Sequence, residues 1–378
     1  MRPTTRVRRC DRSSIRVLFD LAERTDGDLV RLEVGEPDFD TPEHAKEAAI
    51  AAIDDGATNY TSNAGLAALR TAIADTLARE YDHAYDSDDV LVTTGGMEAL
   101  HLACLSVLEP GDDLLIPSPG WPNYWTQARL ADATPVEIPM PFPYDLDADR
   151  VIDQMGPDTG AVMLCSPSNP TGRVFENDAV ARVIDAAREH DAYVIADEVY
   201  ASLTYDRDPV GMATLVGDSA HIITVGSCSK SHAMTGWRVG WLATESDVID
   251  EATKIRESTT ASTPTPSQHA ALAALDGSQE PVREMQTAFA DRRDYVADRL
   301  ADMTGVTAPR SQGAFYAFLD PDGYDDSMAL AKELVTDAGV VLAPGSGFGD
   351  AGAGKLRLSF ANSLDRLETG LDRLDAFL

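Results

Sequence analysis

The residues best suited to chemistry lie in four short polar groups, and each group directly follows an apolar stretch typical of a buried strand. Together they supply a lysine, a carboxylate, a phenol, an amide and several hydroxyls, and Arg238 follows soon after the last group. Ligands of doubly wound sheets bind beyond the carboxyl ends of the strands, so we expect the groups to meet in one crevice. The groups are Thr94-Gly95-Gly96-Met97, Ser166-Pro167-Ser168-Asn169-Pro170-Thr171-Gly172, Asp197-Glu198-Val199-Tyr200 and Gly226-Ser227-Cys228-Ser229-Lys230.

This combination of side chains matches the chemical needs of pyridoxal 5'-phosphate. The aldehyde of that molecule condenses with a lysine amine, its ring nitrogen pairs with a carboxylate, and its ring oxygen accepts from a phenol or an amide. Its phosphate suits an arginine, hydroxyls and the exposed N–H groups of a helix N-terminus, such as the one predicted at Gly95-Gly96. On its own the double glycine predicts no more than a turn, so the prediction depends on the whole set.

Short apolar strands that alternate with helical segments predict a mostly parallel sheet covered by helices on both faces. We therefore expect an α/β fold: a large domain with a mostly parallel sheet flanked by helices, plus a smaller α+β domain. The apolar segments that indicate sheet strands are Val90–Thr93, Asp113–Pro117, Val136–Pro139, Ala161–Cys165, Tyr193–Ala196 and Ile222–Val225.

The pattern changes near Ala270, where a long charged helix, predicted over Glu280–Met303, leads into the strands and helices of a smaller unit. We predict an N-terminal arm and small-domain segment over residues 1–28. A large cofactor-binding domain is predicted over residues 29–272, and a small domain over residues 273–378.

The charge of the chain is strongly negative, with 63 acidic and 31 basic residues and a net charge of -32. Such a surface repels nucleic acids and anionic membranes, so neither is an expected partner. The acidic residues are spread along the chain, and lysines are few, which suits a protein kept soluble in concentrated salt. We hypothesise a halophilic source; an acidic enzyme from a low-salt cell is the alternative. The lysines are Lys46, Lys230, Lys254, Lys332 and Lys355.

Composition also bounds the class of protein. With 44% hydrophobic and 25% charged residues, the chain has the composition of a globular protein. Its apolar runs are far shorter than the ~18 residues of a membrane span, and its basic N-terminus lacks the apolar stretch of a secretory signal. We therefore predict a cytoplasmic protein. The four cysteines have no C-x-x-C spacing and the histidines are scattered, so we predict neither a disulfide framework nor a metal site.

A series of motifs follows in one order along nearly the whole chain. They are Gly35-Glu36-Pro37-Asp38-Phe39-Asp40-Thr41-Pro42, the groups at 166–172 and 197–200, Ser229-Lys230 with Met234-Thr235-Gly236-Trp237-Arg238-Val239-Gly240, Gly313-Ala314-Phe315-Tyr316 and Leu356-Arg357-Leu358-Ser359-Phe360. Through them the chain resembles the fold-type I (class I/II) pyridoxal-phosphate-dependent aminotransferases, in the aspartate and aromatic aminotransferase branch. This resemblance implies that the mostly parallel sheet of the large domain has seven strands. With the acidic composition, the resemblance indicates a halophilic archaeal source.

The resemblance implies catalytic roles for three residues. Lys230 matches the lysine that forms the Schiff base with the cofactor and then moves the proton of the substrate α-carbon. Asp197 resembles the partner of the pyridine nitrogen, whose protonation it maintains. Tyr200, together with Asn169, resembles the hydrogen-bond donors to the ring oxygen.

The resemblance also implies binding roles. Arg238, Ser227 and Ser229 resemble phosphate ligands, joined by the backbone N–H groups of Gly96 and Met97. Tyr60 resembles a tyrosine that reaches the phosphate from the other subunit, which implies a homodimer with shared sites.

Two further roles concern the ring and the substrate. Trp121 resembles the aromatic residue stacked on the pyridine ring. Arg357 resembles the clamp on the substrate α-carboxylate, assisted by Gly35 and Asn169.

One departure limits the substrate prediction. Some dicarboxylate-specific relatives place a lysine directly after the double glycine, where this chain has Met97. We therefore expect an aromatic or aspartate-like L-amino acid as donor and a 2-oxo acid such as 2-oxoglutarate as acceptor. Two alternatives stay open: a carbon–sulfur β-lyase with the same cofactor, and, remotely, a serine acyl-transfer enzyme, because Ser227-Cys228-Ser229-Lys230 formally matches S-x-x-K.

Overall fold

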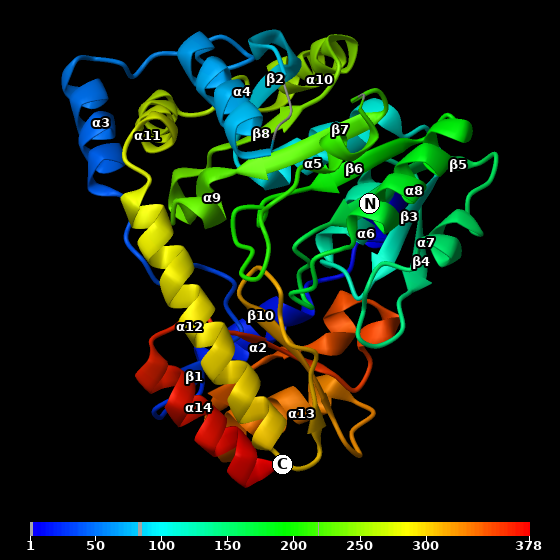
Figure 1. The fold of residues 1–378 in the computed structure, drawn as a ribbon, viewed down its shortest axis with the longest axis vertical. Coiled ribbons are helices and arrows are strands. Elements are labelled where there is room, and N and C mark those ends of the chain that lie inside the picture. Colours follow the sequence, from blue (N-terminus) through cyan, green and yellow to red (C-terminus); the bar gives the residue numbers. More distant parts are fainter. Residues whose placement is uncertain (1–2, 82–84, 218) are drawn as a thin grey trace.

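The computed structural model describes residues 3–81, 85–217 and 219–378, and its largest element is a seven-stranded sheet (Figure 1). The strands are β2 (Val90–Thr93), β3 (Asp113–Ser118), β4 (Thr134–Pro139), β5 (Thr159–Cys165), β6 (Tyr193–Asp197), β7 (Ile222–Ser227) and β8 (Gly240–Ala243). Their order is β2-β8-β7-β6-β5-β3-β4, and β8 alone runs antiparallel to its two neighbours. The predicted α/β fold with a mostly parallel seven-stranded sheet is confirmed.

Helices cover both faces of this sheet. They are α4 (Ala67–Tyr81), α5 (Gly96–Val107), α6 (Asn123–Leu130), α7 (Ala148–Ile152), α8 (Asn177–Glu189), α9 (Cys228–Ser231), α10 (Ser246–Thr259) and α11 (Thr265–Asp276), and α3 (Glu43–Asp54) packs against α11. In β3, Leu114 and Ile116 belong to the apolar cluster that includes α5 and α6, whereas Leu115 packs with α7 and α8 on the other face. Because successive strand residues point to opposite faces, an apolar strand requires cover on both sides.

The strand β8 was not among the strands expected from the sequence. It begins at Gly240, the last residue of the motif that contains Arg238, so its apolar residues do not stand out as a separate segment. In the sheet, Trp241 of β8 is paired with Gly226 of β7. A Cβ atom added at Gly226 would lie 2.3 Å from the Trp241 indole, so this ring occupies the space that a side chain at 226 would need.

A second part of the molecule lies below the sheet in Figure 1. Its strands form a four-stranded antiparallel sheet and a two-stranded parallel one, with orders β12-β13-β10-β9 and β1-β11. Its elements are α2 (Ser14–Ala22), β1 (Val30–Arg31), α12 (Glu280–Asp302), β9 (Val306–Thr307), β10 (Tyr316–Pro321), α13 (Ser327–Glu333), β11 (Val340–Val341), β12 (Ala343–Pro344), β13 (Leu356–Ser359) and α14 (Leu364–Phe377). The domain boundaries after residues 28 and 272 stay a prediction.

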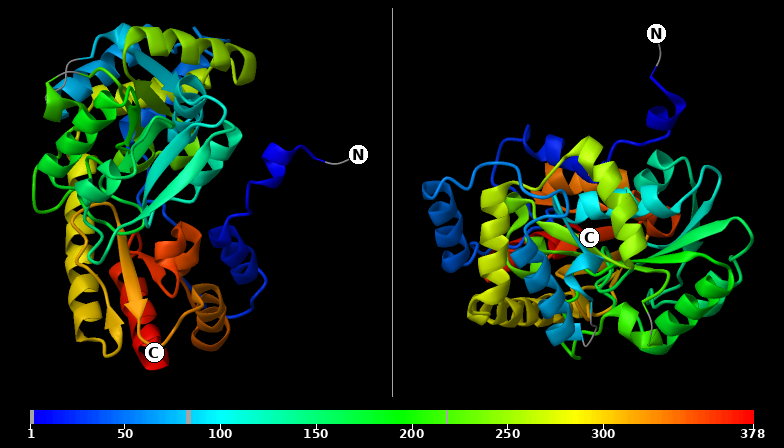
Figure 2. Two further views of the ribbon diagram at one scale, coloured as in Figure 1. Left: turned by 90° about the vertical axis from the view of Figure 1, so that its right-hand side faces the viewer. Right: turned by 90° about the horizontal axis from the view of Figure 1, so that it is seen from above.

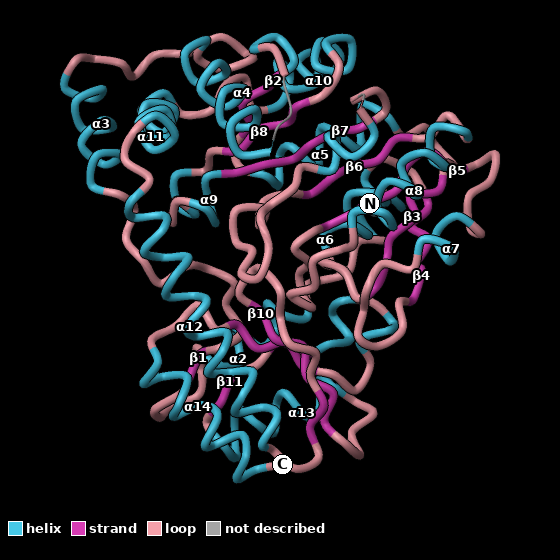
Figure 3. The backbone as a smooth tube through the Cα atoms, viewed as in Figure 1, coloured by secondary structure: helices cyan, strands magenta, loops and turns pink. Residues whose placement is uncertain are grey.

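The two parts meet through α12 and through β10. The long helix α12 runs from the sheet into the second part, and β10 stands below the loops that follow the sheet strands (Figures 1 and 3). The N-terminal segment with α1 (Thr5–Arg8) is exposed and lies against α6 of the sheet part, where Arg6 pairs with Asp132 (Figure 2). No helix in the described ranges combines the length and apolar character needed to cross a membrane.

Candidate active site

A cavity of about 730 Å³ lies where the two parts meet. Asp197 and Lys230 line it from the sheet, at the ends of β6 and β7, and Tyr316 and Arg357 line it from β10 and β13. Every residue predicted for the site from the sequence lines this cavity except Tyr60, whose side chain is 90% exposed and lies elsewhere. The predicted residues that line it are Gly35, Gly96, Met97, Trp121, Asn169, Asp197, Tyr200, Ser227, Ser229, Lys230, Arg238 and Arg357.

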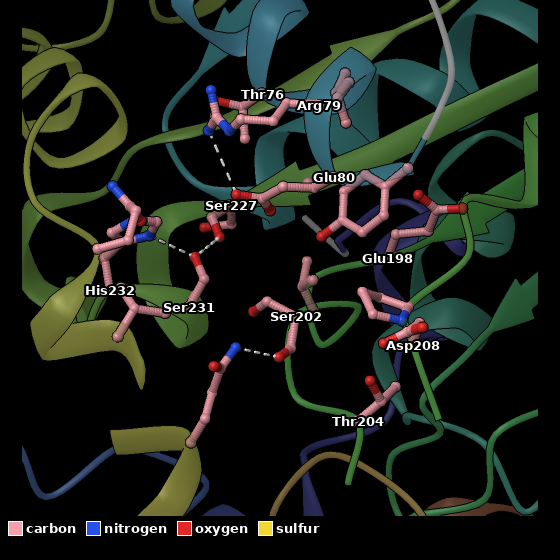
Figure 4. Close-up of a pocket in the computed structure, with 18 of the residues that line it drawn as sticks. Thr76, Arg79, Glu80, Glu198, Ser202, Thr204, Asp208, Ser227, Ser231 and His232 are labelled. Atoms are coloured by element: carbon pink, nitrogen blue, oxygen red, sulfur yellow. Dashed lines mark hydrogen bonds and ion pairs between the residues drawn. The ribbon is translucent and has the colours of Figure 1, made fainter. Parts of the chain in front are cut away.

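A second cavity, of about 810 Å³, shares Val199 and Ser227 with the first (Figure 4). Glu198 and His232 line it, and burial acts on both: it raises the pKa of Glu198 to about 7 and lowers that of His232 to about 4. Because Lys230 lines the first cavity and not the second, we assign the chemistry to the first.

The Lys230 amine is held in the first cavity by the turn that follows β7. Ser227 caps α9, since its Oγ accepts a hydrogen bond from the N–H of Ser229 at 3.0 Å. The Lys230 Nζ donates to the Gly35 carbonyl at 2.6 Å. Burial lowers the pKa of Lys230 to about 8, against the opposing charge of Glu36. About a tenth of this amine is therefore neutral, and nucleophilic, at pH 7, compared with less than about a thousandth for an exposed lysine.

The Asp197 carboxylate lies at the end of β6 and is 2% exposed. It accepts a hydrogen bond from the Tyr124 hydroxyl at 2.7 Å and one from the Val199 N–H at 3.3 Å. Burial outweighs these bonds and raises its pKa to about 6. A cation placed against this carboxylate would restore its charge, which is the property that a protonated ring nitrogen requires of its partner.

Arg357 connects the two parts across the cavity. Its Nη1 donates to the Asn169 Oδ1 at 2.9 Å, and its Nη2 donates to the Glu33 carbonyl at 2.5 Å. Its guanidinium carbon lies 4.4 Å from the centre of the Tyr316 ring, which fixes the plane of the fork. The Nε of Arg357 is buried without a hydrogen-bond partner in the described chain, so the guanidinium keeps donor capacity for a carboxylate.

The N-terminus of α5 and Arg238 form the end of the cavity suited to an anion. Gly95 has a positive φ of 78°, and a Cβ atom there would lie 2.5 Å from the Arg238 Nη2. Arg238 itself has a φ of 55° and donates through Nη1 to the Thr235 carbonyl at 2.8 Å. This close approach leaves backbone N–H groups, a guanidinium and the hydroxyls of Ser227 and Ser229 around one space.

Sequence reasoning assigned no role to two tyrosines of this cavity. Tyr124 orients Asp197, and Tyr316 shares a hydrogen bond of 2.8 Å with the Tyr200 hydroxyl. Tyr124 lies one turn after Trp121, and Tyr316 ends a motif that the resemblance already includes. Those positions were the available signals, but neither reveals a partner that is distant in the sequence.

Comparison with known proteins fits this geometry, since residues 27–374 match the family "Aminotransferase class I and II". The chain belongs to that family. A probable N-acetyl-LL-diaminopimelate aminotransferase of Bacillus subtilis is 37% identical over 99% of this chain and 95% of its own. A probable aspartate aminotransferase of Methanocaldococcus jannaschii is 35% identical over 97% of both chains. The structure of Thermus thermophilus aspartate aminotransferase with maleate superposes with a TM-score of 0.95 at 35% identity, covering 100% of both chains.

The protein is therefore a pyridoxal-phosphate-dependent aminotransferase of fold type I, as the sequence predicted. The side chains of its cavity also fit that cofactor, independently of the comparisons. A buried amine with a lowered pKa, a buried carboxylate and a glycine-lined space at a helix N-terminus match the aldehyde, the ring nitrogen and the phosphate.

The lowered pKa of Lys230 predicts how cofactor binding depends on pH. Only the neutral amine attacks the aldehyde, so the rate of covalent attachment should rise with pH and reach half its maximum near pH 8. Absorbance of the bound cofactor, followed after pyridoxal phosphate is mixed with cofactor-free protein, measures this rate.

A matched variant checks the cause. The charge of Glu36 raises the pKa of Lys230, so Glu36→Gln should move the midpoint to lower pH. A midpoint near 10, the value of an exposed lysine, would contradict the environment described here.

Proposed function

We propose that this aminotransferase moves the amino group of an aromatic or aspartate-like L-amino acid to a dicarboxylic 2-oxo acid such as 2-oxoglutarate, with Lys230 as its central catalytic residue. The observation that supports these roles is the sharing of one cavity by the Lys230 amine, the Asp197 carboxylate and the Arg357 guanidinium.

Substrate binding is proposed to depend on Arg357. Its fork would hold the substrate α-carboxylate in a bidentate pair, and the Asn169 amide and the Gly35 backbone would complete the contact. This grip would place the substrate α-carbon beside the Nζ of Lys230, which is close enough to Gly35 to donate to its carbonyl.

Proton transfer is proposed to depend on Lys230. Pyridoxal phosphate, when bound, supplies an electron sink that makes the α-proton of the amino acid acidic. The neutral Nζ of Lys230 would accept that proton and deliver it to the cofactor carbon C4', which carries the aldehyde in the free cofactor. Its pKa of about 8 suits both directions of transfer near neutral pH.

The remaining predicted residues would hold the cofactor. Asp197, oriented by Tyr124, would face the ring nitrogen, and Tyr200 and Asn169 would donate to the ring oxygen. Trp121 would stack on the ring. The phosphate would bind to Arg238, Ser227, Ser229 and the N–H groups of Gly96 and Met97.

The two alternatives from the sequence are not favoured. The Ser227 Oγ lies 2.8 Å from the Val239 carbonyl, whereas the Lys230 amine donates to Gly35, so the two do not form a nucleophile–base pair. The relatives reported above are named as aminotransferases rather than as lyases.

Removal of the amine tests the central role. Lys230→Ala should lower transamination of a panel of amino donors with 2-oxoglutarate by at least about 10³-fold, because proton transfer loses its base. Product 2-oxo acid, measured by coupled assay, reports the rate, and Lys254→Ala, a change at an exposed lysine, serves as the control. Unchanged turnover in the first variant would refute the assignment, and ammonia with pyruvate formed without an acceptor would indicate a lyase.

We also propose a homodimer in which Tyr60 reaches the phosphate of the other subunit. Its exposure and its absence from the cavity of its own chain support this arrangement. The adjacent Asn59 carbonyl accepts a hydrogen bond from Thr265 at 2.6 Å, which fixes the loop that presents the ring.

Mixed dimers test the shared site. Equal amounts of the Tyr60→Phe and Lys230→Ala chains are unfolded and refolded together. About half of the dimers should then be hybrids, and each hybrid has one intact site, so roughly a quarter of all sites should be intact. Cofactor affinity and turnover of the mixture measure the gain. Activity no greater than the average of the two separate variants would contradict a contribution across subunits.

The acidic composition supports adaptation to concentrated salt, which we propose together with a cytoplasmic location. With a net charge of -32, self-repulsion should destabilise the fold at low salt and fade as the screening length shrinks. The temperature of unfolding, measured by circular dichroism, should rise steeply as potassium chloride increases from about 0.1 M to about 3 M. Full stability at the lowest concentration would count against salt adaptation.

A further inference from the structure

One cationic side chain of the active-site cavity has no role in the reaction described so far. The cations that line this cavity in the described ranges are Arg16, Lys230, Arg238 and Arg357. The last three are assigned to the amine, the phosphate and the α-carboxylate. Arg16 is unassigned, and it comes from α2 of the second part.

The acceptor proposed above has a second carboxylate, and the cavity wall at α5 does not neutralise it. Met97 stands there, and its sulfur is contacted by the amide nitrogens of Asn123 and Gln127 at 3.8 and 3.5 Å. Glu36 also lines the cavity, so an unpaired carboxylate would meet negative charge there, whereas the charge of Glu33 is paired with Arg31.

Arg16 is placed to supply the missing cation. Its guanidinium carbon lies 4.5 Å from the centre of the Phe19 ring, and Phe19 also lines the cavity. The Phe19 ring also contacts Arg31, whose guanidinium carbon lies 4.6 Å from the ring centre. Arg31 in turn pairs with the fully buried Glu33. The platform under Arg16 is thus fixed to the cavity wall.

The guanidinium itself is only loosely held. Its side chain is 61% exposed, and its ion pair with Asp20 spans 3.4 Å. Exposed ion pairs of this kind contribute little, so a carboxylate entering the cavity can replace Asp20 at small cost. A guanidinium binds a carboxylate through two parallel hydrogen bonds, which adds orientation to attraction.

We propose that Arg16 binds the distal carboxylate of dicarboxylic substrates and so determines the preference for them. The inference rests on the proposed function, because it concerns the same cavity and the same acceptor. Arg16 and Arg357 both come from the second part, so the same part of the molecule would hold both ends of a dicarboxylate. Ile15, Phe19 and Leu100 give the same region an apolar wall for an aromatic donor.

The test compares two variants of the loaded enzyme. Arg16→Gln removes the cation, and Arg12→Gln is the matched control, since Arg12 pairs with the same Asp20 at 2.6 Å but does not line the cavity. Titration calorimetry measures the binding of maleate, a dicarboxylate, and of 3-phenylpropionate, a monocarboxylate with an aromatic ring.

The expected result is a loss of maleate affinity of about tenfold or more in Arg16→Gln alone, with 3-phenylpropionate changed far less. The preference for 2-oxoglutarate over pyruvate, as a ratio of kcat/KM values, should fall by a similar factor, and Arg16→Lys should restore part of it. Equal losses for both ligands, or equal effects of the two glutamine variants, would overturn the role of Arg16.

Failure of the broader proposal would look different. If the unchanged enzyme neither binds maleate nor uses 2-oxoglutarate, the acceptor assigned under the proposed function is wrong, and the role of Arg16 falls with it. If it does both and Arg16→Gln is indifferent, only the inference about Arg16 is overturned.

Discussion

The active site depends on the burial of two opposite charges in one cavity. Burial raises the pKa of Asp197 and lowers that of Lys230, so each group is pushed towards its neutral form until a partner arrives. The charge of Lys230 only partly offsets the burial of Asp197, and Tyr124 supplies one hydrogen bond. A cofactor with a basic ring nitrogen and an aldehyde satisfies both groups at once, and the parallel strands β6 and β7 place them at one sheet edge.

The division of labour between the two parts follows from this arrangement. The sheet part supplies the residues proposed to hold the cofactor, whereas α2 and β13 supply the guanidiniums proposed to bind carboxylates. The bond from Arg357 to Asn169 joins the two sets directly. A substrate that binds to both parts would therefore also strengthen the contact between them, which couples recognition to the enclosure of the reacting atoms.

The sequence predicted the sheet and most of the cavity, and the reasons for its failures are physical. Residues that follow strands could be located because strand ends converge at one edge, which applies to Asn169, Asp197 and Lys230. Tyr124 and Arg16 lie on helices whose orientation is set by packing, so their partners are invisible in a linear pattern. The strand β8 was missed because it begins at Gly240, inside the motif that contains Arg238, and so was not recognised as a separate apolar segment. The roles of the site residues stay proposals, as does the contribution of Tyr60 across a dimer.

The indole that covers Gly226 has an effect on how this sequence can change over time. A methyl group at 226 would collide with Trp241, and the resulting separation of β7 from β8 would displace the turn that presents Lys230. A larger residue at 226 therefore requires a smaller one at 241 first, so the order of substitutions at the two positions matters. The Trp241 ring, which occupies the space beside Gly226, thus limits which residues can stand at a position that the reaction itself does not use.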